Sequence, residues 1–405
     1  MLSFCTRRYV ALCRSPLIGR AFMVRTFSET ACQKAEKEMM TAFQEMKQAE
    51  VLMQRRAFTE ADQLYSRVNE IVSSFSPANS PMIDVINRKR LELHYNSNKP
   101  KDITELLKIM QTMKQNIDSR NDKDEALIER VTFANIALHI GKTEESGIYC
   151  RELDSLCSGQ NSTLCLSAML LSTLQQHLMG KERMYDSCLK LKDIASYQGR
   201  FWQLAVLNNT LGMMWDDEAP KDDAVSICKE IKRVAEEMDA ANEISKDNSD
   251  SVRQMLNNSG AYLLFQNNVE EGGAVLKYSL QLSDKLGIDI NQNIHSSNTL
   301  AMMGSILLKE DQPVTCEGLY LQALEVFQKR EKMLTLAGFS RPELFDYSKA
   351  CDGYAQLLVK WDKRERLGET YQQKAAELLM KMSEEADWMF PLTSRFWTPA
   401  LFKWN

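Results

Sequence analysis

The sequence has little glycine and proline, the residues on which tight turns depend. Only 16 glycines and 9 prolines occur among 405 residues, which is below average usage. This scarcity disfavours a fold that needs many tight turns. Long segments rich in Ala, Leu, Glu, Lys, Gln and Met favour helix instead. The composition therefore predicts an all-α protein.

Long hydrophobic runs and short catalytic motifs are also missing. No stretch approaches about 18 uncharged apolar residues, which disfavours a transmembrane span. The patterns GxxxxGK[ST], GxGxxG and GxSxG do not occur. The four histidines, none within a helical turn of another, are His94, His139, His177 and His295. The sequence thus gives no support to an enzyme, a metal site or a cofactor, although a site built from scattered residues stays open.

The ten cysteines contain no CxxC pair. Those in the body of the chain fall at helical positions beside apolar residues, where cysteine packs as a small hydrophobic side chain. We therefore expect buried thiols, with redox or metal chemistry as the alternative.

Acidic residues are absent from residues 1–28, which contain five arginines. An arginine-rich, acid-free segment interleaved with apolar residues resembles a mitochondrial presequence. The stretch Arg25-Thr26-Phe27-Ser28 resembles a matrix-peptidase site. We expect residues 1–28 to be a targeting segment and the protein to be mitochondrial, in the matrix or on the matrix side of the inner membrane. A disordered basic tail is the alternative.

Loss of residues 1–28 would lower the formal charge from −5 to −10, because five arginines and no acids leave. Nucleic-acid binding draws its affinity from cations that neutralise phosphates. The rest of the chain has no basic cluster such as KKRK. The charge therefore does not favour a nucleic-acid partner.

An internal repeat is the strongest positive signal. The stretch LNNTLGMMW (207–215) returns as LNNSGAYLL (256–264). Gly212, Gly260 and Gly304 serve as reference points, and small, then large, then small or apolar residues follow them at the same offsets. Twelve, sixteen and nineteen residues later stand Ala224, Cys228 and Ile231; Gly272, Leu276 and Ser279; and Cys316, Tyr320 and Ala323. Ala134, and the pair Ala61 and Tyr65, continue the pattern towards the N-terminus. A small residue at these places lets two helices approach closely.

This pattern resembles the tetratricopeptide repeat (TPR), and its spacings of 48 and 44 residues resemble the long kinesin-light-chain type. The resemblance covers roughly residues 34–386 and implies a right-handed superhelical α-solenoid of about eight hairpins, with a possible soft break at 245–251. The expected hairpins are 34–76, 82–118, 122–158, 161–198, 200–240, 250–287, 293–335 and 342–386.

The first helices of such arrays line a concave groove that binds a protein segment. The resemblance implies that Asn209 and Asn257 face this groove, where an amide can both donate to and accept from an extended backbone. The other implied groove residues are Met213, Leu264, Phe265 and Asn298. The alternative is that the asparagines bond neighbouring helices.

A chaperone-tail clamp, which some TPR proteins carry, requires Lys and Arg at fixed groove positions. Those positions hold Asn209, Met213, Asn258, Asn298 and Met302, of which only Asn258 agrees. The sequence therefore does not predict a chaperone-tail clamp.

The C-terminal tail, residues 387–405, is rich in aromatic residues. Its last sixteen residues, FPLTSRFWTPALFKWN, include no acid. The tail is expected either to cap the last repeat or to dock on a partner or a peripheral membrane surface. Its predicted docking residues are Phe396, Trp397 and Trp404.

Together these features predict a non-catalytic mitochondrial scaffold or adaptor that binds a protein during assembly or maintenance of a large complex, such as a respiratory complex or the mitoribosome. The chain is similar in length, leader and repeat type to mitochondrial TPR proteins with that role. The alternative is a pentatricopeptide-like RNA-binding protein, but those have a period near 35 and a basic groove, and both features disagree with this sequence.

Overall fold

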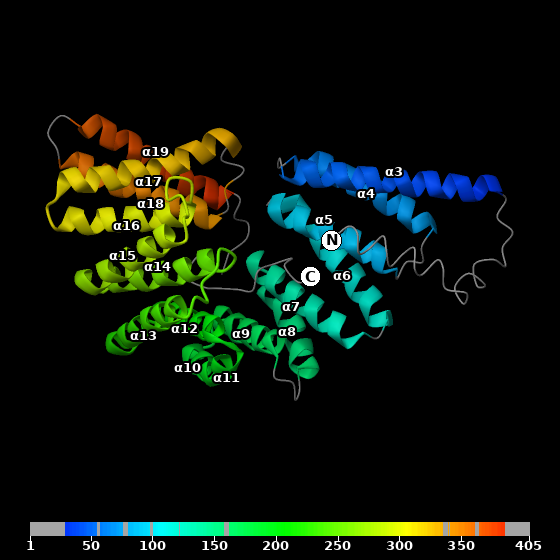
Figure 1. The fold of residues 1–405 in the computed structure, drawn as a ribbon, viewed down its shortest axis with the longest axis horizontal. Helices are drawn as coiled ribbons and strands as arrows, with labels where there is room; N and C mark the ends of the chain where they lie inside the picture. The colour runs from blue at the N-terminus through cyan, green and yellow to red at the C-terminus, as the bar shows by residue number, and fades with distance from the viewer. Residues whose placement is uncertain are drawn as a thin grey trace. The chain divides into compact units, whose positions relative to one another are not determined.

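The computed structural model describes residues 29–54, 57–75, 80–97, 100–120, 122–157, 162–334, 339, 341–360 and 364–384, and every regular element in these ranges is a helix (Figure 1). The protein is an all-α helical-repeat protein. Its helices are α3 (Glu29–Gln54), α4 (Phe58–Phe75), α5 (Pro81–Ser97), α6 (Pro100–Arg120), α7 (Lys123–His139), α8 (Thr143–Leu156), α9 (Thr163–Leu178), α10 (Met184–Leu189), α11 (Leu191–Gln198), α12 (Arg200–Asp216), α13 (Lys221–Ala240), α14 (Ser249–Phe265), α15 (Val269–Lys285), α16 (Ile294–Lys309), α17 (Pro313–Leu334), α18 (Arg341–Val359) and α19 (Glu365–Glu384).

The chain divides into two compact units, residues 1–93 and residues 94–405. In the first unit α3 packs along α4, and Ala61 and Tyr65 lie fully buried in its core. The second unit holds the helices from α6 onward, with two large clusters of buried apolar side chains. The division falls within α5, so α5 begins in one unit and ends in the other.

The helix boundaries follow local chemistry. Asp122 caps the first turn of α7 by accepting hydrogen bonds from the amides of Asp124 and Glu125, both at 3.1 Å. Asn293 caps α16 in the same way through the amide of Ser296, at 3.1 Å. Proline opens α5, α6 and α17, in the position where its missing N–H costs nothing.

Helices in the second unit also end in a repeated way. A residue with left-handed backbone follows the last turn of α12, α13, α14 and α16, and reverses the chain into the next helix. These residues are Glu218, Asn242, Asn267 and Asp311, with φ between 50° and 62°.

Alternate helices of the second unit build its repeats. Each of α7, α12, α14, α16 and α18 packs along the helix that follows it, as the paired ribbons in Figure 1 show. We define the inner layer as α7, α9, α12, α14, α16 and α18, because each of these also contacts the next member of the series. The second helices α8, α13, α15 and α17 each join two members of the inner layer.

The hairpins expected from the sequence agree with the observed helices to within a few residues, with two differences. The second helix of the 161–198 hairpin is broken into α10 and α11, where Arg183 has left-handed backbone just before α10. The expected soft break at 245–251 does not divide the core, because Ile244 and Val252 belong to the same buried cluster.

Candidate functional site on the inner layer

The residues that define the repeat lie at the helix crossings. Ala134, Ala224, Cys316, Tyr320 and Ala323 are fully buried. Gly212, Gly260, Gly272 and Gly304 are also buried. A Cβ at Gly260 would lie 2.7 Å from Leu276, and one at Gly304 would lie 3.1 Å from the Tyr320 ring. At these crossings the absence of a side chain on the first helix leaves the space that Leu276 or Tyr320 of the second helix fills.

One hydrogen bond recurs at the same offset in two hairpins. The Ser146 hydroxyl donates to the Ala134 carbonyl at 2.9 Å, and the Cys316 thiol donates to the Gly304 carbonyl at 3.2 Å. In both cases the donor follows the acceptor by twelve residues. A small hydroxyl or thiol at this position anchors the second helix to the backbone of the first.

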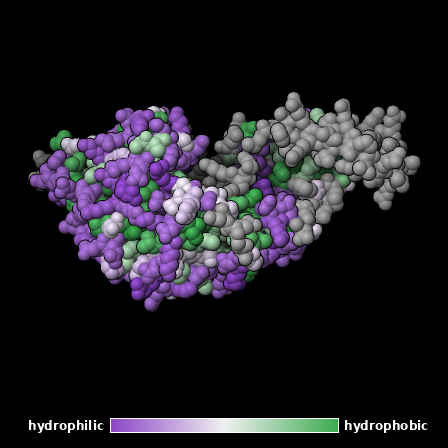
Figure 2. Space-filling model, turned by 60° about the horizontal axis from the view of Figure 1, so that its bottom comes forward, coloured by the Kyte–Doolittle hydropathy of each residue, from purple (hydrophilic) through white to green (hydrophobic). Residues whose placement is uncertain are grey.

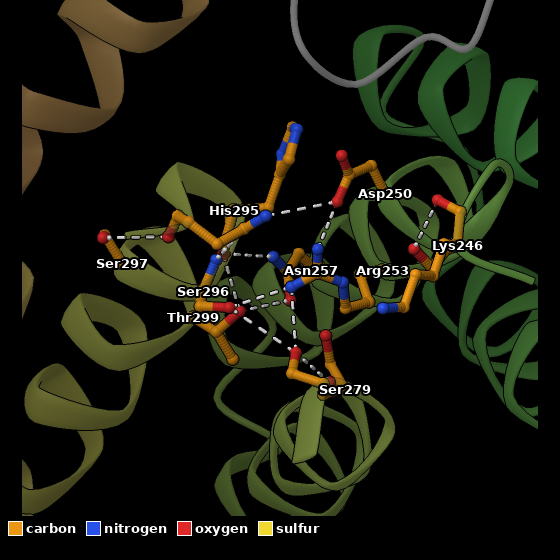
Figure 3. Close-up of polar contacts among 12 residues, drawn as sticks. Lys246, Asp250, Arg253, Asn257, Ser279, His295, Ser296, Ser297 and Thr299 are labelled. Carbon is orange, nitrogen blue, oxygen red and sulfur yellow. Dashed lines mark hydrogen bonds and ion pairs between the residues drawn. The ribbon is translucent and has the colours of Figure 1, made fainter. Parts of the chain in front are cut away.

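Asparagine side chains link three inner-layer helices in series. The Asn258 amide of α14 donates to the Asn208 side chain of α12 at 3.0 Å. Asn257, also on α14, donates to the His295 carbonyl at 3.2 Å and accepts from the Thr299 hydroxyl of α16 at 2.9 Å (Figure 3). We call these contacts the amide ladder. Asn258 bonds α12 and Asn257 bonds α16, because successive residues on a helix point about 100° apart.

A buried arginine strengthens the same junction. The Arg253 guanidinium is 1% exposed and donates to the hydroxyls of Ser283 on α15 and Ser296 on α16, at 2.9 and 2.8 Å. It also forms an ion pair with Asp250. A buried charge is tolerated when it is paired and hydrogen-bonded in this way. Arg253 therefore ties α14, α15 and α16 together at one point.

Three of the residues expected in the groove, Asn209, Met213 and Asn257, are buried side chains. Asn209 is 1% exposed, Asn257 is 3% exposed and Met213 is fully buried. Asn257 spends its amide on α16, as the alternative interpretation expected. The sequence shows that a residue lies near the crossing of two helices, but not that the following hairpin covers it.

Phe265, Leu264 and Asn298 have different surroundings. Phe265 is 67% exposed and its ring leans on Trp215, 5.5 Å away between centroids. Trp215 also meets the buried Tyr262 edge-on at 5.2 Å. Leu264 and Asn298 are half-buried. The ends of α12 and α14 thus carry a cluster of three aromatic side chains, of which Phe265 is exposed to solvent.

The titratable groups show packing rather than reactivity. Burial lowers the pKa of His139 to about 4, and burial also lowers the pKa of His295. Burial raises the pKa of the Cys188 thiol to about 12, although a hydrogen bond with Thr210 opposes this shift. The seven cysteines from Cys150 to Cys351 are free and buried. Among the described residues, no group of three potential ligands could hold a metal ion.

The surface of the second unit is mostly hydrophilic in the view of Figure 2, with small separate hydrophobic patches. Among the described residues, no helix is long and apolar enough to span a membrane. The predicted leader, residues 1–28, and the predicted docking residues Phe396, Trp397 and Trp404 lie outside the described residues.

Comparisons with known proteins found no matching family model and no matching curated sequence. Among solved structures, the chain is similar to BtubC (BKLC) from P. vanneervenii, at 11% identity and a TM-score of 0.40, over 62% of this chain and 90% of that one. It is also similar to a circular tandem repeat protein with novel repeat topology, at 10% identity and a TM-score of 0.28, over 87% of this chain and 98% of that one. Likenesses this distant carry no functional argument.

Proposed function

We propose that the protein is a non-catalytic scaffold that holds an extended segment of a protein partner against the inner layer. The observation that supports this is a stripe of side chains along α14 at spacings of three and four residues. Gln254, Asn258 and Ala261 are half-buried, and Phe265 is exposed. On α16, Asn298, Met302 and Ser305 are half-buried at similar spacing.

This combination suits a peptide better than a small polar substrate. Amide side chains offer a donor and an acceptor to a passing backbone. Methionine and exposed aromatic side chains accept varied apolar side chains, and both are enriched at protein interfaces. The amide ladder fixes the spacing of α12, α14 and α16, so the stripe would be presented on a rigid support.

We further propose that the scaffold works in mitochondria, during assembly or maintenance of a large complex. The acid-free, arginine-rich segment 1–28 supports this proposal. N-terminal sequencing of the mitochondrial form should find Ser28 or a close neighbour as the first residue. A stable, uncleaved cytosolic protein would refute the localisation and leave the scaffold proposal intact.

The binding proposal is tested by proximity labelling and affinity purification from mitochondria. A Phe265→Ala, Asn298→Ala double variant should lose captured partners while keeping its melting temperature, because both side chains lie outside the fully buried core. Tyr197→Ala is the matched control, since Tyr197 is 83% exposed on α11, outside the inner layer. Equal capture by all three proteins would overturn the assignment of the binding surface.

A further inference from the structure

Two of the buried cysteines lie next to each other, although they belong to different hairpins. Cys157 follows the last turn of α8, and Cys165 lies in the first turn of α9, the helix that begins the next hairpin. Both belong to the same buried cluster, with exposed fractions of 6% and 1%. Their side chains are hydrogen-bonded to each other. The junction between these hairpins therefore holds two thiols in contact.

Local hydrogen bonds fix the backbone of both cysteines. The Cys157 amide donates to the Leu153 carbonyl at 2.8 Å and so ends α8. The Cys165 amide donates at 3.3 Å to the Ser162 hydroxyl, which caps α9. The two helices also pack against each other. The folded chain thus keeps the two sulfur atoms close, whereas an unfolded chain lets them separate.

Four other buried thiols contact oxygen atoms instead of a second sulfur. They are Cys150, Cys188, Cys228 and Cys316, whose partners are the Ser146 hydroxyl and the carbonyls of Val206, Ser259 and Gly304. A thiol bonded to an oxygen serves helix packing in the way described above for Cys316. The pair of Cys157 and Cys165 offers a different chemistry, because two adjacent thiols can be oxidised to one disulfide.

We propose that Cys157 and Cys165 form a redox modification site, at which an intramolecular disulfide links α8 to α9. The S–S bond is about 2.0 Å long and has strict geometry. Two thiols that are already in contact reach this geometry by side-chain rotation and a small shift of the helix ends. The proposal is independent of the binding surface on α14 and α16.

The reaction is thiol–disulfide exchange with a small disulfide of the glutathione class. One cysteine thiolate attacks a glutathione sulfur, so that a mixed disulfide forms and one reduced glutathione leaves. The second cysteine thiolate attacks the protein sulfur of the mixed disulfide, and the second reduced glutathione leaves. The protein loses two protons and two electrons, and the oxidant gains them as two thiols. Reduced glutathione in excess reverses both steps.

Burial makes this reaction depend on local opening of the junction. Burial, together with the contact to Cys165, raises the pKa of the Cys157 thiol well above its usual value. Because the thiolate is the nucleophile, this thiol is unreactive while the junction is closed. Proteins open locally far more often than they unfold globally. Oxidation would therefore occur when the ends of α8 and α9 separate, and the disulfide would then prevent further separation.

The disulfide would stiffen the array at one junction. The second helix α8 contacts both α7 and α9 of the inner layer, so a bond at its end restrains two inner-layer helices. The bond also restricts the unfolded chain by closing a loop from residue 157 to residue 165. Oxidation should raise the melting temperature of the second unit by about 5 °C.

The test equilibrates the purified full chain with mixtures of oxidised and reduced glutathione until the yield is constant, and then alkylates the remaining thiols. Trypsin cleaves after Arg151 and Lys181, and the peptide between them contains Cys157 and Cys165 and no other cysteine. The disulfide makes this peptide lighter by two hydrogens and protects both thiols from alkylation. Mass spectrometry of this peptide therefore measures the internal bond separately from every other thiol.

The folded protein should be half oxidised in a mixture about tenfold less oxidising than the same protein needs in concentrated urea, because the fold holds the thiols together. Equal midpoints in both conditions, or glutathione adducts on this peptide in place of the internal bond, would overturn the proposal. A pair that oxidises in urea but stays reduced in the folded protein would also overturn it. This comparison needs no variant.

Single serine variants test the effect on stability. Cys157→Ser and Cys165→Ser should each lose the internal bond and the rise in melting temperature on oxidation. Cys188→Ser is the matched control, since its buried thiol donates to the Val206 carbonyl, and it should keep both. A rise in melting temperature that persists without Cys157 would assign the effect to another thiol and contradict the link between α8 and α9.

Discussion

Single residues decide how closely the hairpins pack. Gly260 lies where α14 crosses α15, and Leu276, which its Cβ would meet, is fully buried and has little room to move. Gly260→Leu should therefore lower the free energy of unfolding by about 1–3 kcal/mol through overpacking. Urea denaturation followed by circular dichroism measures this.

Gly318→Ala is the matched control, because an added Cβ there meets nothing within 4 Å on helix α17. It should stabilise the protein slightly, by about 0.5–1 kcal/mol, since alanine favours helix over glycine. If Gly260→Leu and wild type unfold at the same urea concentration, α14 and α15 do not cross at Gly260.

Asn257 provides a second test at this scale. Asn257→Ala removes its hydrogen bonds to the Thr299 hydroxyl and the His295 carbonyl, and leaves these two groups only the bond between them. The expected loss of stability is about 1–3 kcal/mol, for two hydrogen bonds that each contribute about 0.5–1.5 kcal/mol. Asn298→Ala, at a half-buried site on α16, should change stability by less than about 0.5 kcal/mol. If Asn257→Ala leaves the melting temperature unchanged, the amide ladder does not stabilise the packing of α14 against α16.

At the scale of helices, the hairpins could be predicted from the sequence because their crossings constrain composition. Ala134, Gly260 and Gly304 must be small for two helices to pack closely. The positions of these small residues can therefore be recognised in the sequence alone. The direction of Asn257 could not be predicted, because its burial depends on α16, which begins almost forty residues later.

The α18 helix carries a pH-dependent contribution to stability. Burial raises the pKa of Asp346 to about 7, against the opposing attraction of Lys349 and with a smaller contribution from Glu343. A raised carboxyl pKa gives stability that is present below the unfolded value near 3.8 and is lost as the pH rises through 7.

Asp346→Asn removes this dependence. The stability of the variant relative to wild type should therefore be higher at pH 8 than at pH 4. The change is about 1–2 kcal/mol, discounted because the side chain is only half-buried. Thermal melts of both proteins at the two pH values measure it. If the difference in stability between the two proteins does not vary with pH, the Asp346 carboxyl is solvated in the folded protein and the prediction is wrong.

At the scale of the whole molecule, two units of unequal size should unfold separately. The first unit has two small buried clusters, whereas the second has two large ones. Because smaller units bury less of their surface, calorimetry should show a first transition from residues 29–93 and a later one from the second unit. Tyr65→Ala should lower only the first, and Tyr320→Ala only the second, since both side chains are fully buried. A single transition that shifts with either variant would contradict independent unfolding.

The buried thiols give this array a built-in set of reporters. Cys150, Cys188, Cys228 and Cys351 have pKa values raised by burial to about 12, so at neutral pH they are neither ionised nor accessible to an alkylating reagent. Each lies in a different hairpin. Its rate of modification therefore measures how often that hairpin opens. Mass spectrometry of the modified peptides would give a map of local opening along the array in the natural sequence, without any engineered label.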